Sequence, residues 1–410
     1  MANLKEVIFS ITNRCNLRCR MCDIPYGKIE ELSTEQWKGV IKDASRLGAQ
    51  TIVFSGGEPL LREDIFELIT FSRASNLNAC VTSNGHLIDE QVAHNLSTSG
   101  VNVVNISVEG NKETHDYLRG FGSFDKAIMA LENLRKYKIE STVASTVSRY
   151  NYKDLLYVLG IAKDYGATTV RLQPFNAIFL KDNKRKSEFL IDKRDIQKVA
   201  DMIKSFISAS QEYKISINPV GYLLKIPEYL SGKNFYPNNC GALWYSCPIN
   251  PNGDLFPCWI EGANNKLIGN VKIDGLYELW LSDKRIKMVS SIIDKGCKGC
   301  LMSCYDEAFD RKLLKESLVE NAKKIKKITD YRKVINKLVQ FFKGQITKLR
   351  LRYRFYTSYR GSFFSIFVRR LKSSLSKPRS LKKDKQTEKE FILTEISLAK
   401  RRLKKEMRLL

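Results

Sequence analysis

The sequence lacks any apolar run long enough to cross a bilayer. In its last quarter the longest apolar stretch, Phe363–Val368, is interrupted by Ser365, and no basic segment followed by an apolar one stands at the N-terminus. A membrane-spanning helix needs about 20 apolar residues in succession, so neither a spanning segment nor a secretory leader is predicted. We therefore expect a cytoplasmic protein.

Histidine is also scarce, with three residues among 410, and none lies near the first group of cysteines. With 43% hydrophobic and 28% charged residues, the composition excludes collagen-like and wholly disordered chains. A chain with this hydrophobic content can bury a sizeable core, so its ten cysteines are not needed as stabilising disulfides. In a reducing cytosol, clustered cysteines indicate metal ligands or catalytic thiols rather than disulfides.

Acidic residues are rare only near the C-terminus. Residues 311–410 carry 31 basic and 8 acidic residues, whereas residues 1–310 are nearly balanced, so most of the net charge of +25 belongs to the last quarter. Between residues 331 and 380, 14 basic residues and 10 aromatic ones occur with no acidic residue. We expect residues 311–410 to form a basic, aromatic-rich helical tail.

Residues 1–220 alternate β-branched runs with stretches of helical period, which predicts an α/β core domain. The predicted helices include Thr34–Leu47, with a capping box at Ser33 and Gln36, and Lys153–Tyr165, capped by Asn151. Parallel strands need helical crossovers, so we expect a partial (β/α)6 barrel with its chemistry at the carboxyl ends of the strands. The six predicted strands are Val7–Ile11, Thr51–Phe54, Asn78–Thr82, Val103–Val108, Thr142–Val147 and Val170–Leu172.

The strongest chemical signal follows the first predicted strand, where Cys15, Cys19 and Cys22 stand within eight residues. Zinc prefers four ligands, whereas three thiolates on a four-iron cluster leave one iron open for a substrate or cofactor. The second strand ends in Gly56-Gly57-Glu58. Glycines let the backbone approach a ligand closely, and a carboxylate accepts hydrogen bonds from an ammonium group.

Together these motifs resemble the radical S-adenosylmethionine (SAM) superfamily, which carries CxxxCxxC after the first strand and Gly-Gly-Glu after the second. The resemblance implies that Cys15, Cys19 and Cys22 hold a catalytic [4Fe–4S] cluster whose open iron binds SAM. It also implies that SAM is bound by residues at the ends of the first four strands: Gly56, Gly57, Glu58, Ser83, Asn84, Ser107 and Glu109. Glu109 stands where the family more often has Asp, and Met21 where an aromatic residue is usual.

Residues 221–310 are loop-rich and hold six cysteines, as in segments held together by metal. They resemble a SPASM domain, the auxiliary-cluster extension of radical SAM enzymes. The resemblance implies one auxiliary [4Fe–4S] cluster, with Cys247 or Cys304 as substitute ligands and a structural zinc site as the alternative. The implied ligands are Cys240, Cys258, Cys297 and Cys300.

The resemblance predicts an enzyme that cleaves SAM reductively to a 5′-deoxyadenosyl radical and abstracts hydrogen from a peptide or another large substrate. An electron donor such as flavodoxin or ferredoxin is implied, and we expect no leader-peptide recognition domain before the first strand. A basic, aromatic tail suits an anionic membrane surface. This gives a first alternative, a membrane-associated lipid or lipid-linked sugar as substrate, with the enzyme peripheral at the inner membrane face.

A second alternative is a non-catalytic iron–sulfur or zinc scaffold whose tail binds a membrane or nucleic acid. We consider nucleic acid the weaker of these partners. A partner protein, or a tail without order, also agrees with the composition of residues 311–410. The three histidines are expected to be surface or packing residues, although His115 follows a strand that ends at the predicted catalytic edge.

Overall fold

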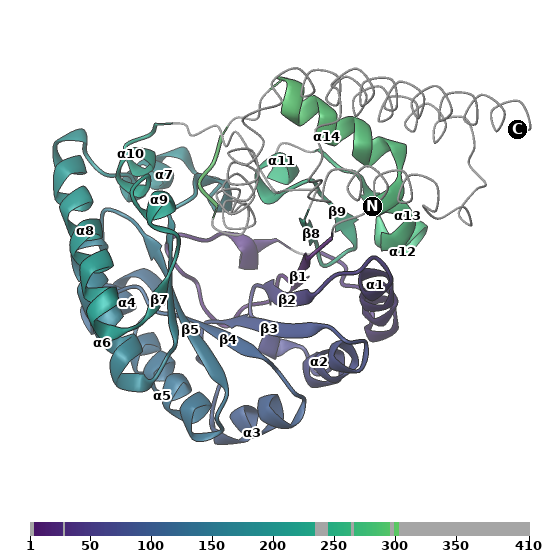
Figure 1. Cartoon of the computed structure of the whole chain (residues 1–410), viewed down its shortest axis with the longest axis horizontal. Coiled ribbons are helices and arrows are strands. Elements are labelled where there is room, and N and C mark those ends of the chain that lie inside the picture. Colours follow the sequence, from purple (N-terminus) through teal and green to yellow (C-terminus); the bar gives the residue numbers. More distant parts are fainter. Residues whose placement is uncertain (1–3, 28, 234–244, 264–265, 296–298, 303–410) are drawn as a thin grey trace, which may run out of the picture. The chain divides into compact units, whose positions relative to one another are not determined.

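The computed structural model describes residues 4–27, 29–233, 245–263, 266–295 and 299–302 (Figure 1). Within these ranges the first half of the chain alternates strands with helices, as the hydrophobic periodicity predicts. All six expected strands are present, most of them one or two residues longer than predicted, and a short seventh follows. They are β1 (Glu6–Thr12), β2 (Thr51–Gly56), β3 (Asn78–Ser83), β4 (Val103–Ser107), β5 (Glu140–Val147), β6 (Thr169–Pro174) and β7 (Ser216–Ile217).

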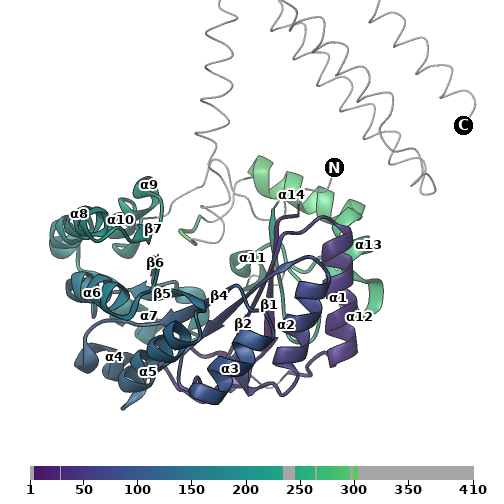
Figure 2. The same cartoon turned by 60° about the horizontal axis from the view of Figure 1, so that its bottom comes forward.

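Helices connect these strands and lie along the outer side of the sheet, where α1, α2, α3, α5 and α6 follow one another (Figures 1 and 2). This arrangement places each strand's carboxyl end at one common edge. The helices of this half are α1 (Thr34–Arg46), α2 (Ile65–Ala74), α3 (Glu90–Thr98), α4 (Lys112–Arg119), α5 (Ser123–Lys136), α6 (Leu155–Tyr165), α7 (Asn183–Phe189), α8 (Ile196–Tyr213), α9 (Val220–Leu223) and α10 (Ile226–Leu230).

The sheet is open rather than closed. Its order is β10-β9-β8-β1-β2-β3-β4-β5-β6-β7, and β1 to β7 pair in parallel along this order. Because β1 and β7 are not paired with each other, the parallel strands form a partial barrel. The predicted fold class is therefore confirmed.

The second region continues the same sheet. Strand β8 (Ser246–Ile249) pairs in parallel with β1, and β9 (Asp254–Leu255) and β10 (Gly269–Asn270) follow in antiparallel order. This pairing joins residues about 240 positions apart, which no local sequence pattern reveals. The remaining helices are α11 (Trp259–Ala263), α12 (Val271–Asp274), α13 (Leu276–Leu281) and α14 (Asp283–Lys295).

Local sequence signals explain where α1 begins. The Ser33 side chain accepts a hydrogen bond from the Gln36 amide at 3.3 Å, and the Gln36 side chain accepts one from the Ser33 amide at 2.8 Å. This confirms the predicted capping box. In the core, Trp37 packs on Phe9 of β1 with ring centroids 4.6 Å apart, and burying such a side chain contributes roughly 1.5–3 kcal/mol.

The prediction for the sixth helix was wrong at its start. A short 3-10 turn, Tyr152–Asp154, precedes α6, which begins at Leu155, and the Asn151 side chain does not cap it. Asn151 is buried and donates to the Glu109 carbonyl oxygen at 2.7 Å instead. A residue with good capping chemistry is thus used to tie two loops together.

The predicted tail, residues 311–410, lies outside the described residues, as do Cys240, Cys297 and Cys304. Among the residues that are described, the search for a helix long and apolar enough to cross a membrane found none.

Candidate functional site

The three cysteines of the CxxxCxxC motif converge in the loop after β1. Each is half-buried, and each thiol is close enough to the other two to affect its ionisation. Burial raises the pKa of all three thiols, that of Cys22 to about 11, while the Arg119 guanidinium opposes this rise. Metal binding must therefore displace protons from these thiols.

No three His, Cys, Asp or Glu side chains in the described ranges approach closely enough to share a single metal ion. A four-iron cluster places each thiolate on a different iron and therefore asks for wider spacing than one ion does. The three convergent thiols suit such a cluster in number and chemistry.

The backbone of the Gly-Gly turn after β2 is in direct contact with the loop that carries the cysteines. The Gly57 amide donates to the Thr12 carbonyl at 2.7 Å, and the Glu58 amide donates to the Arg14 carbonyl at 2.8 Å. A Cβ on Gly56 would lie 2.4 Å from the Thr12 oxygen, and one on Gly57 only 2.2 Å from the Arg14 oxygen. In this structure the two glycines therefore allow the backbone of one loop to touch that of the other.

Glu58 lies at the centre of the site with no exposed surface. Its carboxylate accepts hydrogen bonds from the Ser83 hydroxyl at 3.0 Å, the Asn84 amide at 2.8 Å and the Leu60 amide at 3.2 Å. Burial raises the pKa of Glu58 to about 7 in spite of these donors. The structure thus joins three predicted site residues, Glu58, Ser83 and Asn84, in one hydrogen-bonded group.

Asn84 connects this hydrogen-bonded group to the cysteine loop. Its side-chain nitrogen donates to Asn16 Oδ1 at 2.8 Å and lies 3.8 Å from Cys15 Sγ. Its side-chain oxygen accepts from the His86 amide at 2.9 Å, which fixes the orientation of the side-chain amide. The ends of β1, β2 and β3 are therefore connected by polar contacts that end at a thiol.

Glu109, after β4, is held by a partner that the sequence did not indicate. Its Oε1 accepts from Arg119 Nε at 2.8 Å and from Arg119 Nη2, and its Oε2 accepts from the Thr146 amide at 2.7 Å and the Ser145 hydroxyl at 3.3 Å. A carboxylate has about four lone-pair positions, so these donors occupy them all. Ser107, at the end of β4, is 9% exposed.

Arg119 connects Glu109 to the cysteines. Its side chain is 14% exposed, forms the ion pair with Glu109 and lies close enough to the Cys19 thiol to favour its ionised form. The backbone supports this position, because the Arg20 amide donates to the Leu118 carbonyl at 2.8 Å. In the sequence, the only sign of this contact is an arginine in the helix that follows Glu109. Arginines at such positions are too common to identify an ion-pair partner.

His115 is a packing residue, as expected, and has no exposed surface. Its Nδ1 accepts a hydrogen bond from the Glu109 amide at 3.2 Å, and its ring packs edge-on against Phe124 with centroids 5.7 Å apart. Burial lowers its pKa to about 3. His115 is therefore neutral at physiological pH and serves to hold the backbone at Glu109.

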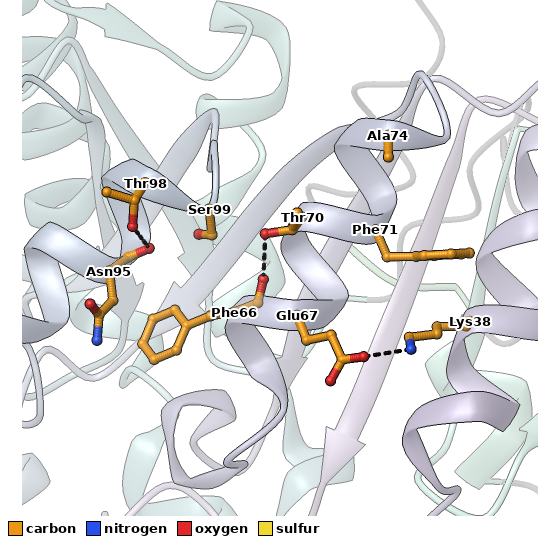
Figure 3. Close-up of a pocket in the computed structure, with 9 residues that line it drawn as sticks. All are labelled: Lys38, Phe66, Glu67, Thr70, Phe71, Ala74, Asn95, Thr98 and Ser99. Atoms are coloured by element: carbon orange, nitrogen blue, oxygen red, sulfur yellow. Dashed lines mark hydrogen bonds and ion pairs between the residues drawn. The ribbon is translucent and has the colours of Figure 1, made fainter.

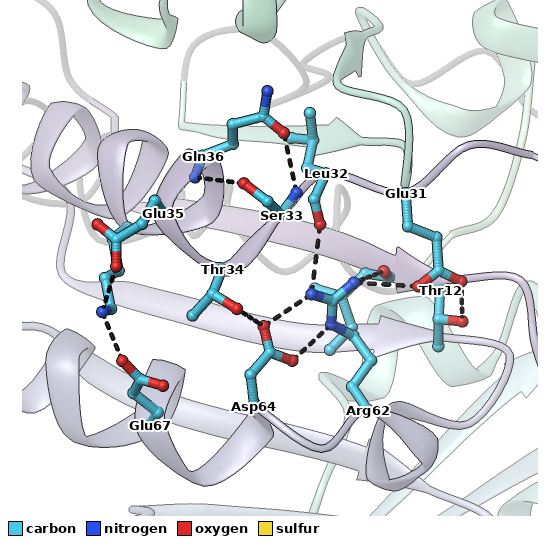
Figure 4. Close-up of polar contacts among 12 residues, drawn as sticks. Thr12, Glu31, Leu32, Ser33, Thr34, Glu35, Gln36, Arg62, Asp64 and Glu67 are labelled. Atoms are coloured by element: carbon cyan, nitrogen blue, oxygen red, sulfur yellow. Dashed lines mark hydrogen bonds and ion pairs between the residues drawn. The ribbon is translucent and has the colours of Figure 1, made fainter.

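A second buried ion-pair network anchors the segment that follows the cysteine loop (Figure 4). Arg62 donates to Glu31 at 3.0 Å, to both oxygens of Asp64 at 2.7 and 2.8 Å, and to the backbone oxygens of Ile11 and Leu32. Glu31 also accepts from the Thr12 hydroxyl. The end of β1 is thereby fixed to the start of α1.

The second cysteine group is only partly described. Cys258 and Cys300 belong to one small apolar cluster with Met302, Phe179 and Trp259. Cys247 lies in β8 in the main core with no exposed surface and is not part of that cluster. Of the predicted auxiliary ligands, the structure thus brings Cys258 and Cys300 together.

Two grooves lie on the outer helical layer, away from these residues. One of about 450 Å³ is lined by residues of α1, α2 and α3, among them Lys38, Phe66 and Asn95 (Figure 3). The other, of about 680 Å³, is lined by α5 and α6. Neither is lined by a predicted site residue.

Comparison with known proteins identifies this arrangement. The radical SAM superfamily model matches residues 9–162, and the SPASM iron–sulfur cluster-binding domain model matches residues 240–304. Mycofactocin maturase MftC of Mycolicibacterium smegmatis is 31% identical over 302 residues, covering 71% of this chain and 74% of that protein. The chain belongs to the radical SAM superfamily. As a radical SAM enzyme with a SPASM domain, it is expected to use [4Fe–4S] clusters and SAM, and the residues described above suit both.

Other similarities are narrower. Fe-coproporphyrin III synthase of Methanosarcina barkeri is 36% identical over 162 residues, which cover 38% of this chain and only 41% of that relative. The structure of Streptococcus suis SuiB bound to the precursor peptide SuiA has a TM-score of 0.59 at 16% identity and covers 73% of this chain and 72% of that one. The latter likeness establishes the fold alone.

Proposed function

We propose that this radical SAM enzyme modifies a peptide by abstracting a hydrogen atom from it. One observation carries the enzymatic part: three thiols converge where the Glu58, Ser83 and Asn84 group meets the loop after β1. If bound by Cys15, Cys19 and Cys22, a [4Fe–4S] cluster would supply the one-electron reductive chemistry that cleaves SAM and makes hydrogen abstraction from an unactivated C–H bond possible. The chain's own residues hold, orient and enclose these groups.

Cys15, Cys19 and Cys22 are the proposed ligands of this cluster. We place SAM over the carboxyl ends of β2, β3 and β4. The predicted binding residues there are Gly56, Gly57, Glu58, Ser83, Asn84 and Ser107, and the carboxyl edge of parallel strands is where such folds bind ligands.

For Glu109 we propose a positioning role. Because its four acceptor positions already have donors, its carboxylate has no free acceptor for SAM. It instead orients Arg119, whose cation lies beside the thiols and favours their ionised, metal-binding form.

The auxiliary [4Fe–4S] cluster is proposed on Cys240, Cys258, Cys297 and Cys300, with zinc as the alternative metal. The apolar cluster that holds Cys258 and Cys300 supports one shared site for these two. The burial of Cys247 in the main core argues against its serving as a substitute ligand. Iron, sulfide and zinc analysis decides the metal: about eight irons favours two four-iron clusters, and about four irons with one zinc favours zinc.

A peptide is the proposed substrate because the SPASM match extends through residues 240–304 and the long alignment is to a maturase. Two further classes remain testable. A tetrapyrrole is suggested by the relative named as a coproporphyrin synthase. A membrane lipid or lipid-linked sugar is suggested by the basic, aromatic tail, for which sedimentation of the full chain with anionic vesicles is the direct test.

The enzymatic proposal is tested by anaerobic reconstitution with iron, sulfide, dithionite and SAM. We expect 5′-deoxyadenosine from the wild type and none above background from Cys15→Ala. Cys80→Ala is the matched control, because Cys80 is a half-buried cysteine of β3 outside the site, and it should retain full production. Wild-type protein that forms no 5′-deoxyadenosine, or Cys15→Ala that equals it, would refute the proposal.

A further inference from the structure

One short segment contacts both cysteine groups. We define the bridge segment as residues 175–185, which follow β6 directly and end within α7. It forms hydrogen bonds with the loop that carries the first three cysteines, and it packs against the apolar cluster that holds Cys258 and Cys300. The bridge segment therefore connects the proposed catalytic site to the proposed auxiliary site.

Asp23, the residue after the third cysteine, makes most of the contacts with the catalytic loop's side of the bridge segment. Its amide donates to the Phe179 carbonyl at 2.9 Å. Its carboxylate accepts from the Lys181 amide at 2.8 Å and from Arg185 Nη1 at 2.7 Å. Arg185 Nη2 also donates to the Arg20 carbonyl at 2.7 Å. These hydrogen bonds join the end of the cysteine loop to residues about 160 positions further along the chain.

The Asp23 contacts are largely shielded from water, because the side chain is only 12% exposed. Both carboxylate oxygens have a donor, one of them the Arg185 guanidinium. Charge-assisted hydrogen bonds of this kind are shorter and stronger than neutral ones. Because Asp23 directly follows Cys22, fixing Asp23 also restricts where the Cys22 thiol lies, as residues behind a metal ligand commonly do.

Asn176 and Phe179 make the contacts with the second cysteine group. Phe179 packs against the apolar cluster of Cys258 and Met302. The Asn176 side chain is buried, and its nitrogen donates to Met302 Sδ at 3.4 Å while its oxygen accepts from the Ile178 amide at 3.2 Å. Phe179 thus takes part in both sets of contacts, through its carbonyl oxygen on one side and through its ring on the other.

The residues that follow Cys300 are packed inside the protein. Leu301 and Met302 are buried, and the hydroxyl of the buried Tyr222 in α9 donates to the Leu301 carbonyl at 3.1 Å. Close-packed interiors transmit a displacement to neighbouring residues rather than absorb it. A shift of Cys300 would therefore be passed through Met302 to Asn176 in the bridge segment.

We propose that the bridge segment couples the two cysteine sites, with Asp23 as the positioning residue through which it holds the end of the catalytic loop. Metal held by Cys258 and Cys300 would fix the residues packed against them, and the bridge segment would pass this restraint to Asp23. Loss of the auxiliary metal therefore loosens the loop at Cys22. This inference rests on the proposed function, because it requires metal at both cysteine sites.

Amide hydrogen exchange, measured by mass spectrometry on the reconstituted full-length chain under anaerobic conditions, tests the coupling because it reports local opening. The reporter is the peptide that contains residues 20–27, in which the Asp23 amide donates to the Phe179 carbonyl. The test variant is Cys258→Ala, which removes a proposed auxiliary ligand. The control is Cys80→Ala, which removes a half-buried cysteine of β3 outside both sites.

We expect Cys258→Ala to speed exchange of the reporter roughly tenfold, as the loss of one hydrogen bond to a charged group would. Asp23→Ala should speed it by a similar factor. Adding Cys258→Ala to Asp23→Ala should then change exchange by less than about twofold, because the connection is already broken. Asp192→Ala is the matched control for Asp23→Ala, since its ion pair with Arg194 is exposed, and it should leave the full response to Cys258→Ala.

The coupling would be overturned by an unchanged reporter in Cys258→Ala or by equal acceleration in Cys80→Ala. The same added acceleration with and without Asp23 would also overturn it, because Asp23 would then act only locally. Equal acceleration of peptides from α2 would show a general loss of stability and count against the coupling too. Asp23→Asn keeps the size of the side chain and removes its charge, so it should weaken the response to Cys258→Ala in part.

Two measurements on the same wild-type preparation separate this inference from the proposed function. These are its metal content and its formation of 5′-deoxyadenosine from SAM with dithionite. Absence of the product, or of any metal beyond one four-iron cluster, would refute the proposed function. Presence of both, together with reporter exchange that does not respond to Cys258→Ala, would refute the coupling alone.

Discussion

Two buried glutamates at the same sheet edge are accommodated by different means. Glu58, after β2, meets hydroxyl and amide donors, and burial raises its pKa to about 7. Glu109, after β4, meets the Arg119 guanidinium as well as such donors. Glu58 can therefore gain or lose its proton near physiological pH, whereas the Glu109 carboxylate is paired directly with a cation. The two parts of the site therefore differ in electrostatics, although each places a glutamate just after a strand.

The largest effect is expected from removing the cation. Arg119→Gln leaves the Glu109 carboxylate buried without its ion-pair partner, which costs about 3–5 kcal/mol of unfolding free energy. Urea unfolding of the metal-free protein measures this loss. Arg194→Gln is the matched control, because its pair with Asp192 is exposed, and it should unfold like the wild type. Equal losses of unfolding free energy in the two variants would contradict the distinction drawn between Glu58 and Glu109.

The pH dependence of stability should reveal Glu58. Its pKa in the folded state, about 7, exceeds the ordinary 4.5, so the folded protein holds this proton more tightly than the unfolded chain does. The associated stability is complete below pH 4.5 and is lost as pH rises to 7, a change of about 3 kcal/mol. Glu58→Gln cannot titrate there, so the wild-type minus variant difference should fall across that window. A flat difference would contradict the neutral setting proposed for Glu58.

Removing single hydroxyls should give the smallest effects. Ser83→Ala deletes one of the donors to Glu58, and because no cation pairs with that carboxylate we expect a loss of about 1 kcal/mol and a higher Glu58 pKa. Ser145→Ala deletes a longer bond to Glu109, which retains Arg119, so its cost should be smaller. Unfolding curves of the two variants, measured side by side, make the comparison. A larger loss of unfolding free energy for Ser145→Ala would contradict the expected order.

Local patterns were enough to predict the strands, the α1 cap and the cysteine loop. The β-branched runs, the Ser33 and Gln36 pair and the Cys15, Cys19, Cys22 spacing each extend over a few residues, so the sequence displays them directly. The grouping of Glu58 with Ser83 and Asn84 followed from placing strand ends at one edge.

Contacts between distant residues were not predictable in the same way. The ion pair of Arg119 with Glu109 depends on how α4 returns to the sheet, and the pairing of β8 with β1 crosses most of the chain. Asn151 also had the right residue type for a helix cap, yet it bonds to Glu109 instead. In each case tertiary geometry decides which of several suitable partners a side chain meets.

The central claim is that three thiols hold a cluster with one open iron. Electron paramagnetic resonance of the dithionite-reduced, reconstituted protein tests it most directly, recorded before and after SAM is added. We predict a reduced-cluster signal in the wild type that changes on SAM addition, and loss of that SAM-sensitive signal in Cys15→Ala. A wild-type signal that SAM leaves unchanged, or a SAM-sensitive signal that survives in Cys15→Ala, would contradict the assignment.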